Sequence, residues 1–261
     1  MKDIKIIVAT HKKYNMPKSD IYLPIHVGRK NKMDLGYIGD HTEDNISEKN
    51  SSFCELTGLY WAWKNLDCEV IGLSHYRRYF TATGKVNSFL KGNDKMQLIL
   101  NESELTEILS GYEAILPKKR NYYIDTVWSH YSNAHYIEDL EKTKAIIEEK
   151  YPEYISSFNT IMNQSKMHLY NMFVFKKELF DKYCEWLFDI LFELECQVDI
   201  SNYDNYQKRI FGFISERLFN VWILHNNLNV KECNVLTLEK INWLEKINQF
   251  LKRKFKGNAY G

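Results

Sequence analysis

The chain is 261 residues long, with 44% hydrophobic and 26% charged residues, which is enough to bury one sizeable core in a single large domain. Its formal net charge of +1 provides no global attraction for nucleic acid, so we expect no nucleic-acid partner. The five cysteines form no C-x-x-C pair, and no apolar run is long enough for a signal peptide or a membrane span. These features predict a protein with reduced thiols that is cytoplasmic or peripheral on the inner face of the plasma membrane.

An apolar segment at residues 4–9 predicts a buried strand that opens an α/β domain. The strand leads into Thr10 and His11. An apolar strand that ends in a polar loop is typical of the start of nucleotide-binding α/β domains, but it can also be a purely structural strand. A shorter strand is predicted at residues 21–27, where Pro24 indicates a sheet edge or a kink.

Residues 28–53 are polar and show no pattern of secondary structure, so they are either disordered or a functional loop. Within this segment, Asp44 and Asn45 could hold a ribose, a sugar hydroxyl or a metal, or they could lie on a solvated surface. Glu55 follows at the start of the next helix, where a carboxylate also favours the helix dipole as a simple cap.

A helix followed by a buried strand forms the centre of the sequence, over residues 54–66 and 70–73. The strand delivers four polar side chains at its carboxyl end, which are those of His75, Tyr76, Arg77 and Arg78. Open α/β sheets bind ligands beyond the carboxyl ends of their strands, so we expect an anionic ligand here. The alternative is a solvated strand end with surface ion pairs.

Basic and aromatic residues follow another short strand, predicted at residues 114–117. Residues 118–120 and His130 belong to this group, which suits a phosphate or a sugar face but could also be a solvated turn. His168 and Asn171 lie where an apolar, strand-like segment begins. His168 could bind a ligand there or could be a hydrogen-bonded core histidine.

The C-terminal part is predicted to be largely helical. Residues 177–196 form a strongly amphipathic core helix. Glu216 and Arg217 lie near the beginning of another helix, either as a local ion pair or as a base beside a phosphate-binding partner. A basic helix near the C-terminus either binds a membrane surface or packs on the domain. Further helices are predicted at 102–112, 138–149 and 154–162, and a weak strand at 235–236.

Several segments together resemble a family of bacterial proteins encoded in capsular and exopolysaccharide loci, which are taken to be glycosyltransferases of galactofuranosyltransferase type. The resemblance runs from the first strand to about Asn234. The segments that carry it are DNIS at 44–47, CELTGLYWAWK at 54–64, GLSHYRRYF at 72–80, YNMF at 170–173 and GFISERL at 212–218.

The resemblance implies a GT-A-like, Rossmann-type sheet flanked by helices, with a helical C-terminal part. We expect one such domain over residues 1–236 and a basic amphipathic helix over residues 237–261. The implied activity is transfer of a hexose, best guessed as galactofuranose from UDP-galactofuranose, to a lipid-linked glycan on the inner face of the plasma membrane. The alternatives are a pyranosyl transferase that uses UDP-galactose or UDP-glucose, or a catalytically inactive nucleotide-sugar-binding protein.

The resemblance also assigns roles to residues of this sequence. The residues expected to bind the nucleotide sugar are Thr10, His11, Asp44, Asn45, Glu55, His75, Tyr76, Arg77, Arg78 and Arg217. Those expected in an acceptor or sugar pocket are His130, His168 and Asn171.

A transferase must stabilise a departing nucleoside diphosphate, which either a divalent metal or fixed cations can do. The sequence has no Asp-x-Asp at a strand end, and two arginines stand there instead, so cationic stabilisation is favoured while Mn²⁺ or Mg²⁺ stays open. A carboxylate must also take the proton of the acceptor hydroxyl. Glu216 is the first candidate for this base and Asp204 the second.

Overall fold

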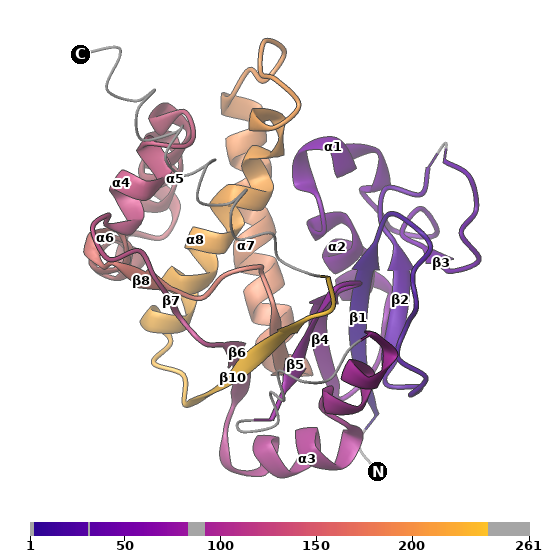
Figure 1. The fold of residues 1–261 in the computed structure, drawn as a ribbon. Coiled ribbons are helices and arrows are strands. Elements are labelled where there is room, and N and C mark those ends of the chain that lie inside the picture. Colours follow the sequence, from indigo (N-terminus) through magenta and orange to yellow (C-terminus); the bar gives the residue numbers. More distant parts are fainter. Residues whose placement is uncertain (1–2, 31, 83–91, 240–261) are drawn as a thin grey trace.

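The computed structural model describes residues 3–30, 32–82 and 92–239, and it shows a mixed α/β protein with one main sheet (Figure 1). This architecture confirms the predicted fold class. The strands are β1 (Ile4–Thr10), β2 (Tyr22–His26), β3 (Ile38–Gly39), β4 (Val70–His75), β5 (Arg78–Thr81), β6 (Ala114–Pro117), β7 (Arg120–Asn121), β8 (Lys166–Met167), β9 (Phe173–Lys176) and β10 (Val230–Thr237).

The helices cover the sheet and also form a bundle beside it. They are α1 (Asn50–Phe53), α2 (Leu56–Asn65), α3 (Glu102–Gly111), α4 (Val127–Ser132), α5 (Ile137–Lys150), α6 (Ile155–Asn163), α7 (Lys177–Gln197) and α8 (Ile210–His225), with short 3₁₀ turns η1 (Ser47–Lys49), η2 (Gly92–Leu98), η3 (Pro152–Tyr154) and η4 (Gln207–Arg209). Figure 1 shows α4 to α8 gathered on one side of the molecule and β1 to β3 on the other.

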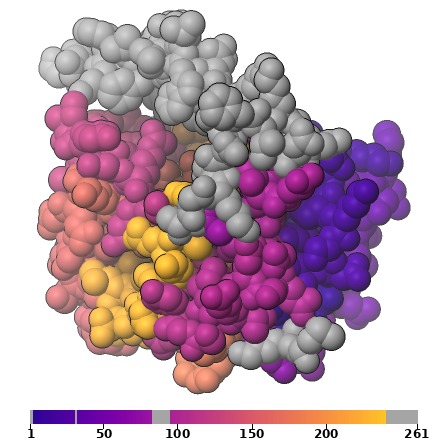
Figure 2. Space-filling view, turned by 60° about the horizontal axis from the view of Figure 1, so that its bottom comes forward, coloured from indigo at the N-terminus to yellow at the C-terminus, as the bar shows by residue number. Residues whose placement is uncertain are grey.

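The main sheet has the strand order β3-β2-β1-β4-β5-β10-β6-β9, and β4 pairs additionally with β9. Strands β1, β2 and β4 are parallel, as expected for an α/β domain, whereas β5 and β9 are antiparallel to their neighbours. Because β9 pairs with both β6 and β4, the strands β4, β5, β10, β6 and β9 form a closed ring of paired strands at one end of the sheet. Figure 2 shows the yellow C-terminal segment that contains β10 beside the magenta segment that contains β6, although the two lie far apart in the sequence.

Two sequence expectations about the chain path are corrected. The central strand does not end at Leu73 but continues to His75, and Tyr76 and Arg77 form the turn into β5, where His75 pairs with Arg78. Residues 28–53 are not structureless, because they contain β3, η1 and α1.

The buried carboxylate of Asp40 orders this segment. It accepts hydrogen bonds from the backbone N–H of Gly28 (2.7 Å) and from the hydroxyls of Ser47 (2.6 Å) and Thr57 (2.5 Å). A buried carboxylate needs such donors, so the surrounding loop is fixed around it.

Helix α8 begins at Ile210, earlier than the sequence pattern indicated, because Ile210, Phe211 and Ile214 are all buried in the main core. Glu216 therefore lies in the second turn of the helix rather than at its beginning. The predicted C-terminal helix at 237–261 falls outside the described residues beyond Glu239. In the part of the chain that the structure describes, no helix is long and apolar enough to cross a membrane.

Candidate active site

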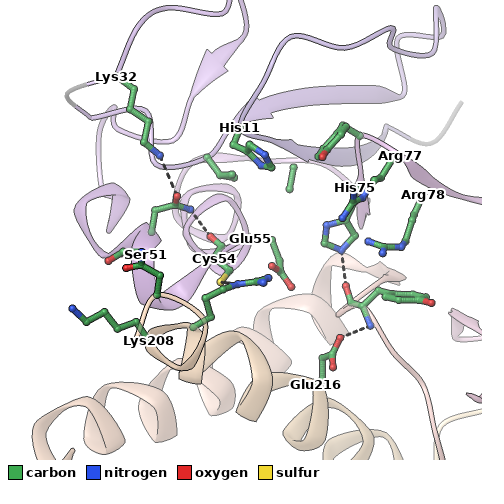
Figure 3. A pocket seen from close by; sticks show the side chains of 17 residues that line it. His11, Lys32, Ser51, Cys54, Glu55, His75, Arg77, Arg78, Lys208 and Glu216 are labelled. Atoms are coloured by element: carbon green, nitrogen blue, oxygen red, sulfur yellow. Dashed lines mark hydrogen bonds between the residues drawn. The ribbon is translucent and has the colours of Figure 1, made fainter. Parts of the chain in front are cut away.

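A cavity of about 800 Å³ lies where the end of β1, the β4–β5 turn, the α1–α2 junction and the start of α8 meet (Figure 3). Seven ionic side chains line it, of which five are cationic and two are carboxylates: Lys32, Arg77, Arg78, Lys208, Arg209, Glu55 and Glu216. The excess of positive charge within one concave site attracts anions. Arginine suits phosphate oxygens in particular, because its planar fork donates two parallel hydrogen bonds.

A tight turn at Tyr170 and Asn171 holds three groups of the cavity in place. Both residues have left-handed backbones, with φ of +75° and +52°. The backbone N–H of Tyr170 donates to Glu216 Oε1 (2.7 Å), and its carbonyl lies 2.7 Å from His75 Nε2. The side-chain amide of Asn171 donates to Glu55 Oε1 (2.8 Å). One turn thus fixes both carboxylates and the histidine.

Burial sets the protonation of the two groups that touch Tyr170. It raises the pKa of Glu216, although the neighbouring Arg217 and the Tyr170 N–H favour the ionised form. It lowers the pKa of His75, which favours the neutral ring at neutral pH. Because the Tyr170 carbonyl only accepts hydrogen bonds, His75 Nε2 must carry the proton of that neutral ring. The raised pKa of Glu216 makes it a more basic carboxylate than an exposed glutamate.

The β4–β5 turn presents two arginines to the cavity in different settings. The Arg78 guanidinium lies over the Tyr170 ring, 4.4 Å from its centroid, and burial lowers the pKa of Arg78. Arg77 forms an ion pair with Glu239 (2.8 Å) at the rim. His11 packs edge-on against Tyr76, with ring centroids 5.4 Å apart, and burial lowers the pKa of His11.

Comparison with known proteins places the chain in a family. Residues 5–227 match the model described as "Domain of unknown function (DUF4422)". The chain belongs to the DUF4422 family. Among solved structures it is similar to the apo form of the WbbM bifunctional glycosyltransferase, with 33% sequence identity and a TM-score of 0.85 over 91% of this chain. The match spans only 46% of the WbbM chain. No curated protein matches the sequence.

The cavity of this DUF4422 domain brings together seven of the residues expected from the sequence: His11, Glu55, His75, Tyr76, Arg77, Arg78 and Glu216. Asn171 is buried behind them and acts on Glu55. Four expected donor-site residues do not line it, which are Thr10, Asp44, Asn45 and, as described below, Arg217. Thr10 is buried and donates to the Lys12 carbonyl (2.6 Å), Asp44 accepts from the Tyr60 hydroxyl (3.1 Å), and Asn45 binds carbonyls of its own loop.

Asp204 and Arg217 do not line the cavity either. The Asp204 carboxylate accepts hydrogen bonds from the backbone N–H groups of Tyr206 and Gln207 (2.8 Å each), which fix the turn before η4, and Asp204 does not line the cavity. Arg217 is buried beneath Glu216, with Nη1 3.4 Å from Glu216 Oε2 and 2.9 Å from the Phe213 carbonyl. Successive helix residues point in different directions, so Glu216 and Arg217 cannot both face the cavity.

Neither expected acceptor histidine lines the cavity. His130 stacks on Tyr122, with ring centroids 3.9 Å apart, and its Nδ1 lies 3.4 Å from Arg217 Nη2. His168 is buried, and its Nδ1 lies 2.5 Å from the Pro117 carbonyl. Burial lowers the pKa of His168 to about 4, which fits the structural alternative given above.

Sequence reasoning missed several residues that line the cavity, among them Lys32, Cys54, Tyr170, Lys208 and Arg209. Cys54 has φ of +53°, and its Sγ accepts a hydrogen bond from Arg209 Nε (3.3 Å), while burial raises its pKa to about 11. A usable signal existed for Arg209, because it precedes Glu216 by seven residues and so falls on the same helical face.

The donor set for a metal is sparse. Within residues 3–30, 32–82 and 92–239, no three His, Cys, Asp or Glu side chains gather as a possible ligand group. A divalent ion in the cavity would meet the two carboxylates of Glu55 and Glu216, each of which already accepts a hydrogen bond.

Proposed function

We propose that this chain is a glycosyltransferase that takes its sugar from a UDP-hexose. The observation that carries the proposal is the pairing of five cationic side chains with a buried, more basic carboxylate, Glu216, in one cavity. The first feature suits the diphosphate of a nucleotide sugar, and the second suits proton removal from an acceptor hydroxyl. The similarity to one half of a bifunctional glycosyltransferase supports the same reading.

In this proposal the cations stabilise the leaving group. As the bond between the sugar and the diphosphate breaks, its electron pair stays on the departing UDP and increases the negative charge there. In this proposal Arg77 and Arg78, which line the cavity at the β4–β5 turn, donate charge-assisted hydrogen bonds to that charge, and Arg77 exchanges its ion pair with Glu239 for the diphosphate. Lys32 and Lys208 add positive charge from the opposite side of the cavity (Figure 3), and Arg209 also lines it.

Glu216 is the proposed general base. It would take the proton from an acceptor hydroxyl while that oxygen forms its bond to the anomeric carbon, which inverts the configuration there. Glu55 replaces Asp204 as the second candidate, since Glu55 lines the cavity and Asp204 does not.

UDP-galactofuranose is the donor that the family resemblance implies, and a lipid-linked glycan at the inner membrane face is the implied acceptor. The test is to incubate the purified chain with UDP-galactofuranose, UDP-galactose or UDP-glucose and an octyl galactoside acceptor, and to measure UDP release and product. We expect turnover of one donor, reduced about 10²- to 10⁴-fold by Glu216→Gln. Asp204→Asn serves as the matched control and should retain activity.

Binding of UDP without turnover of any donor would favour the inactive binding protein. Equal loss in both variants would contradict the role given to Glu216.

A further inference from the structure

An exposed apolar tip projects from the loop between β7 and α4. Tyr123 is 84% exposed and Ile124 is 75% exposed, and they are consecutive in the chain. No two of the other exposed large apolar residues in the described ranges are consecutive in the chain. Single exposed apolar residues are ordinary, but an adjacent pair at a loop tip indicates a surface that is covered in use. Two local hydrogen bonds shape the turn at the tip: the Tyr123 N–H donates to Asn121 Oδ1 (2.8 Å), and the Ile124 N–H donates to the Tyr122 carbonyl (2.7 Å).

Cationic side chains surround this tip. Lys118, Lys119 and Arg120 precede it and are exposed, and the exposed Lys166 of β8 pairs in register with Asn121. None of these four cations forms an ion pair within the described part of the chain. Asp125 directly follows the tip and Glu232 lies on β10 next to β6, so the four exposed cations outnumber these two acidic side chains.

A chain of side-chain contacts connects the tip to the cavity. Tyr122 stacks on His130, His130 contacts Arg217, and Arg217 contacts Glu216, with the distances given above. Glu216 is also among the charges that act on the Tyr122 hydroxyl. Figure 1 shows β7 and β8 on the side of the molecule that carries α4 and α8, away from β2 and β3.

We propose that residues 118–124, with Lys166, dock on an anionic membrane surface. The cations would meet lipid phosphates, while Tyr123 and Ile124 would enter the boundary between headgroups and acyl chains. Tyrosine is enriched at that depth, and an exposed isoleucine gains most there. An acidic protein would satisfy the lysines but not the protruding Ile124. The docking holds without the proposed transferase activity. One consequence does rest on that activity: docking would hold the cavity close to the membrane surface, where a lipid-linked acceptor carries its sugar.

The test is co-sedimentation of the full chain with phosphatidylcholine vesicles, with and without half phosphatidylglycerol. We expect binding to the anionic vesicles that falls roughly fivefold for each lysine removed in Lys118→Ser/Lys119→Ser. Ile124→Ser should reduce it on the order of tenfold. The matched controls are Lys13→Ser/Lys18→Ser and Ile38→Ser, which alter exposed residues elsewhere and should bind as wild type does.

Two results would overturn the proposal. The first is that the wild type does not sediment with anionic vesicles, which would point to an acidic protein as the partner instead. The second is that the tip variants bind as well as their controls. Calorimetry with UDP on the same variants separates the two proposals. We expect the tip variants to retain the UDP affinity of the wild type. Failure of the wild type to bind UDP would remove the transferase proposal and leave the vesicle result to decide the docking.

Discussion

At the scale of single residues, Glu216 is held between opposing influences. Burial favours its protonated form, whereas the Tyr170 N–H and Arg217 favour the carboxylate, and burial has the larger effect on its pKa. A carboxyl group whose pKa is raised in this way is a stronger base when ionised, and general bases in enzymes are tuned in the same direction.

The raised pKa predicts the pH dependence of the proposed transfer. A base must be ionised, so kcat/KM should fall as the pH drops through the pKa of Glu216, with a midpoint above the ordinary glutamate value of about 4.3. Ionised Glu216 also destabilises the fold, because its pKa is raised on folding, so stability is lost as the pH rises through that value. Glu216→Gln should therefore unfold no more readily than the wild type at pH 8.

Rate profiles and thermal unfolding of both proteins check this prediction. An acid limb at the ordinary carboxylate position, or one that persists in Glu216→Gln, would contradict it.

Glu239 offers a second prediction at this scale. Its carboxylate lies 2.8 Å from Arg77 and 3.7 Å from Lys12, and the hydrogen bond from Arg77 lowers its pKa. A diphosphate in the cavity would compete with it for Arg77. Glu239→Gln is therefore expected to tighten UDP binding roughly two- to fivefold, since both partners are partly exposed.

The control is Glu178→Gln, which removes a surface pair with Lys182 on α7. The gain should shrink at higher salt, because ions screen exposed charges. Unchanged affinity at low salt would show that Glu239 does not compete with the ligand.

At the scale of elements, sequence patterns predicted what local periodicity determines. The core helix expected at 177–196 is α7 (Lys177–Gln197), because its buried stripe is complete within the segment itself. Strand β5 was not predicted, because Arg78–Thr81 pairs with Asn234–Thr237 from the far end of the chain. Local periodicity carries no information about such a partner.

The sequence pattern also did not predict the left-handed turn at Tyr170 and Asn171, and it indicated only that a strand begins there. The left-handed backbone at Asn171 can be tested with two substitutions. Asn171→Ala and Asn171→Gly both remove the donor to Glu55, but only alanine adds the strain of a positive φ. We expect the alanine variant to have a free energy of unfolding about 1 kcal/mol lower than that of the glycine variant.

Urea unfolding of the two variants measures this difference. Equal free energies of unfolding would contradict the left-handed backbone at Asn171.

At the scale of the whole molecule, the cavity is assembled from segments that no sequence window joins. The sequence indicated the β4–β5 arginines and Glu216, because polar residues after apolar runs are visible locally. Lys32 and Lys208 could not be found this way, since Lys32 reaches the cavity from the loop between β2 and β3 and Lys208 from η4, far apart in the sequence. The same limit applies to Glu55, which the sequence suggested only as a donor-site residue or a helix cap and which the fold brings to the same cavity as Glu216.

The most direct test of the central claim, a cationic site for a nucleoside diphosphate, is calorimetric titration of UDP against the wild type and Arg77→Ala, with and without Mn²⁺. Lys13→Ala, which removes an exposed cation outside the cavity, is the matched control. We predict saturable binding without metal that weakens at least about tenfold in Arg77→Ala, because a charge-assisted hydrogen bond is lost, and that is retained in Lys13→Ala. Binding that appears only with Mn²⁺, or that is the same in Arg77→Ala as in the wild type, would contradict the account.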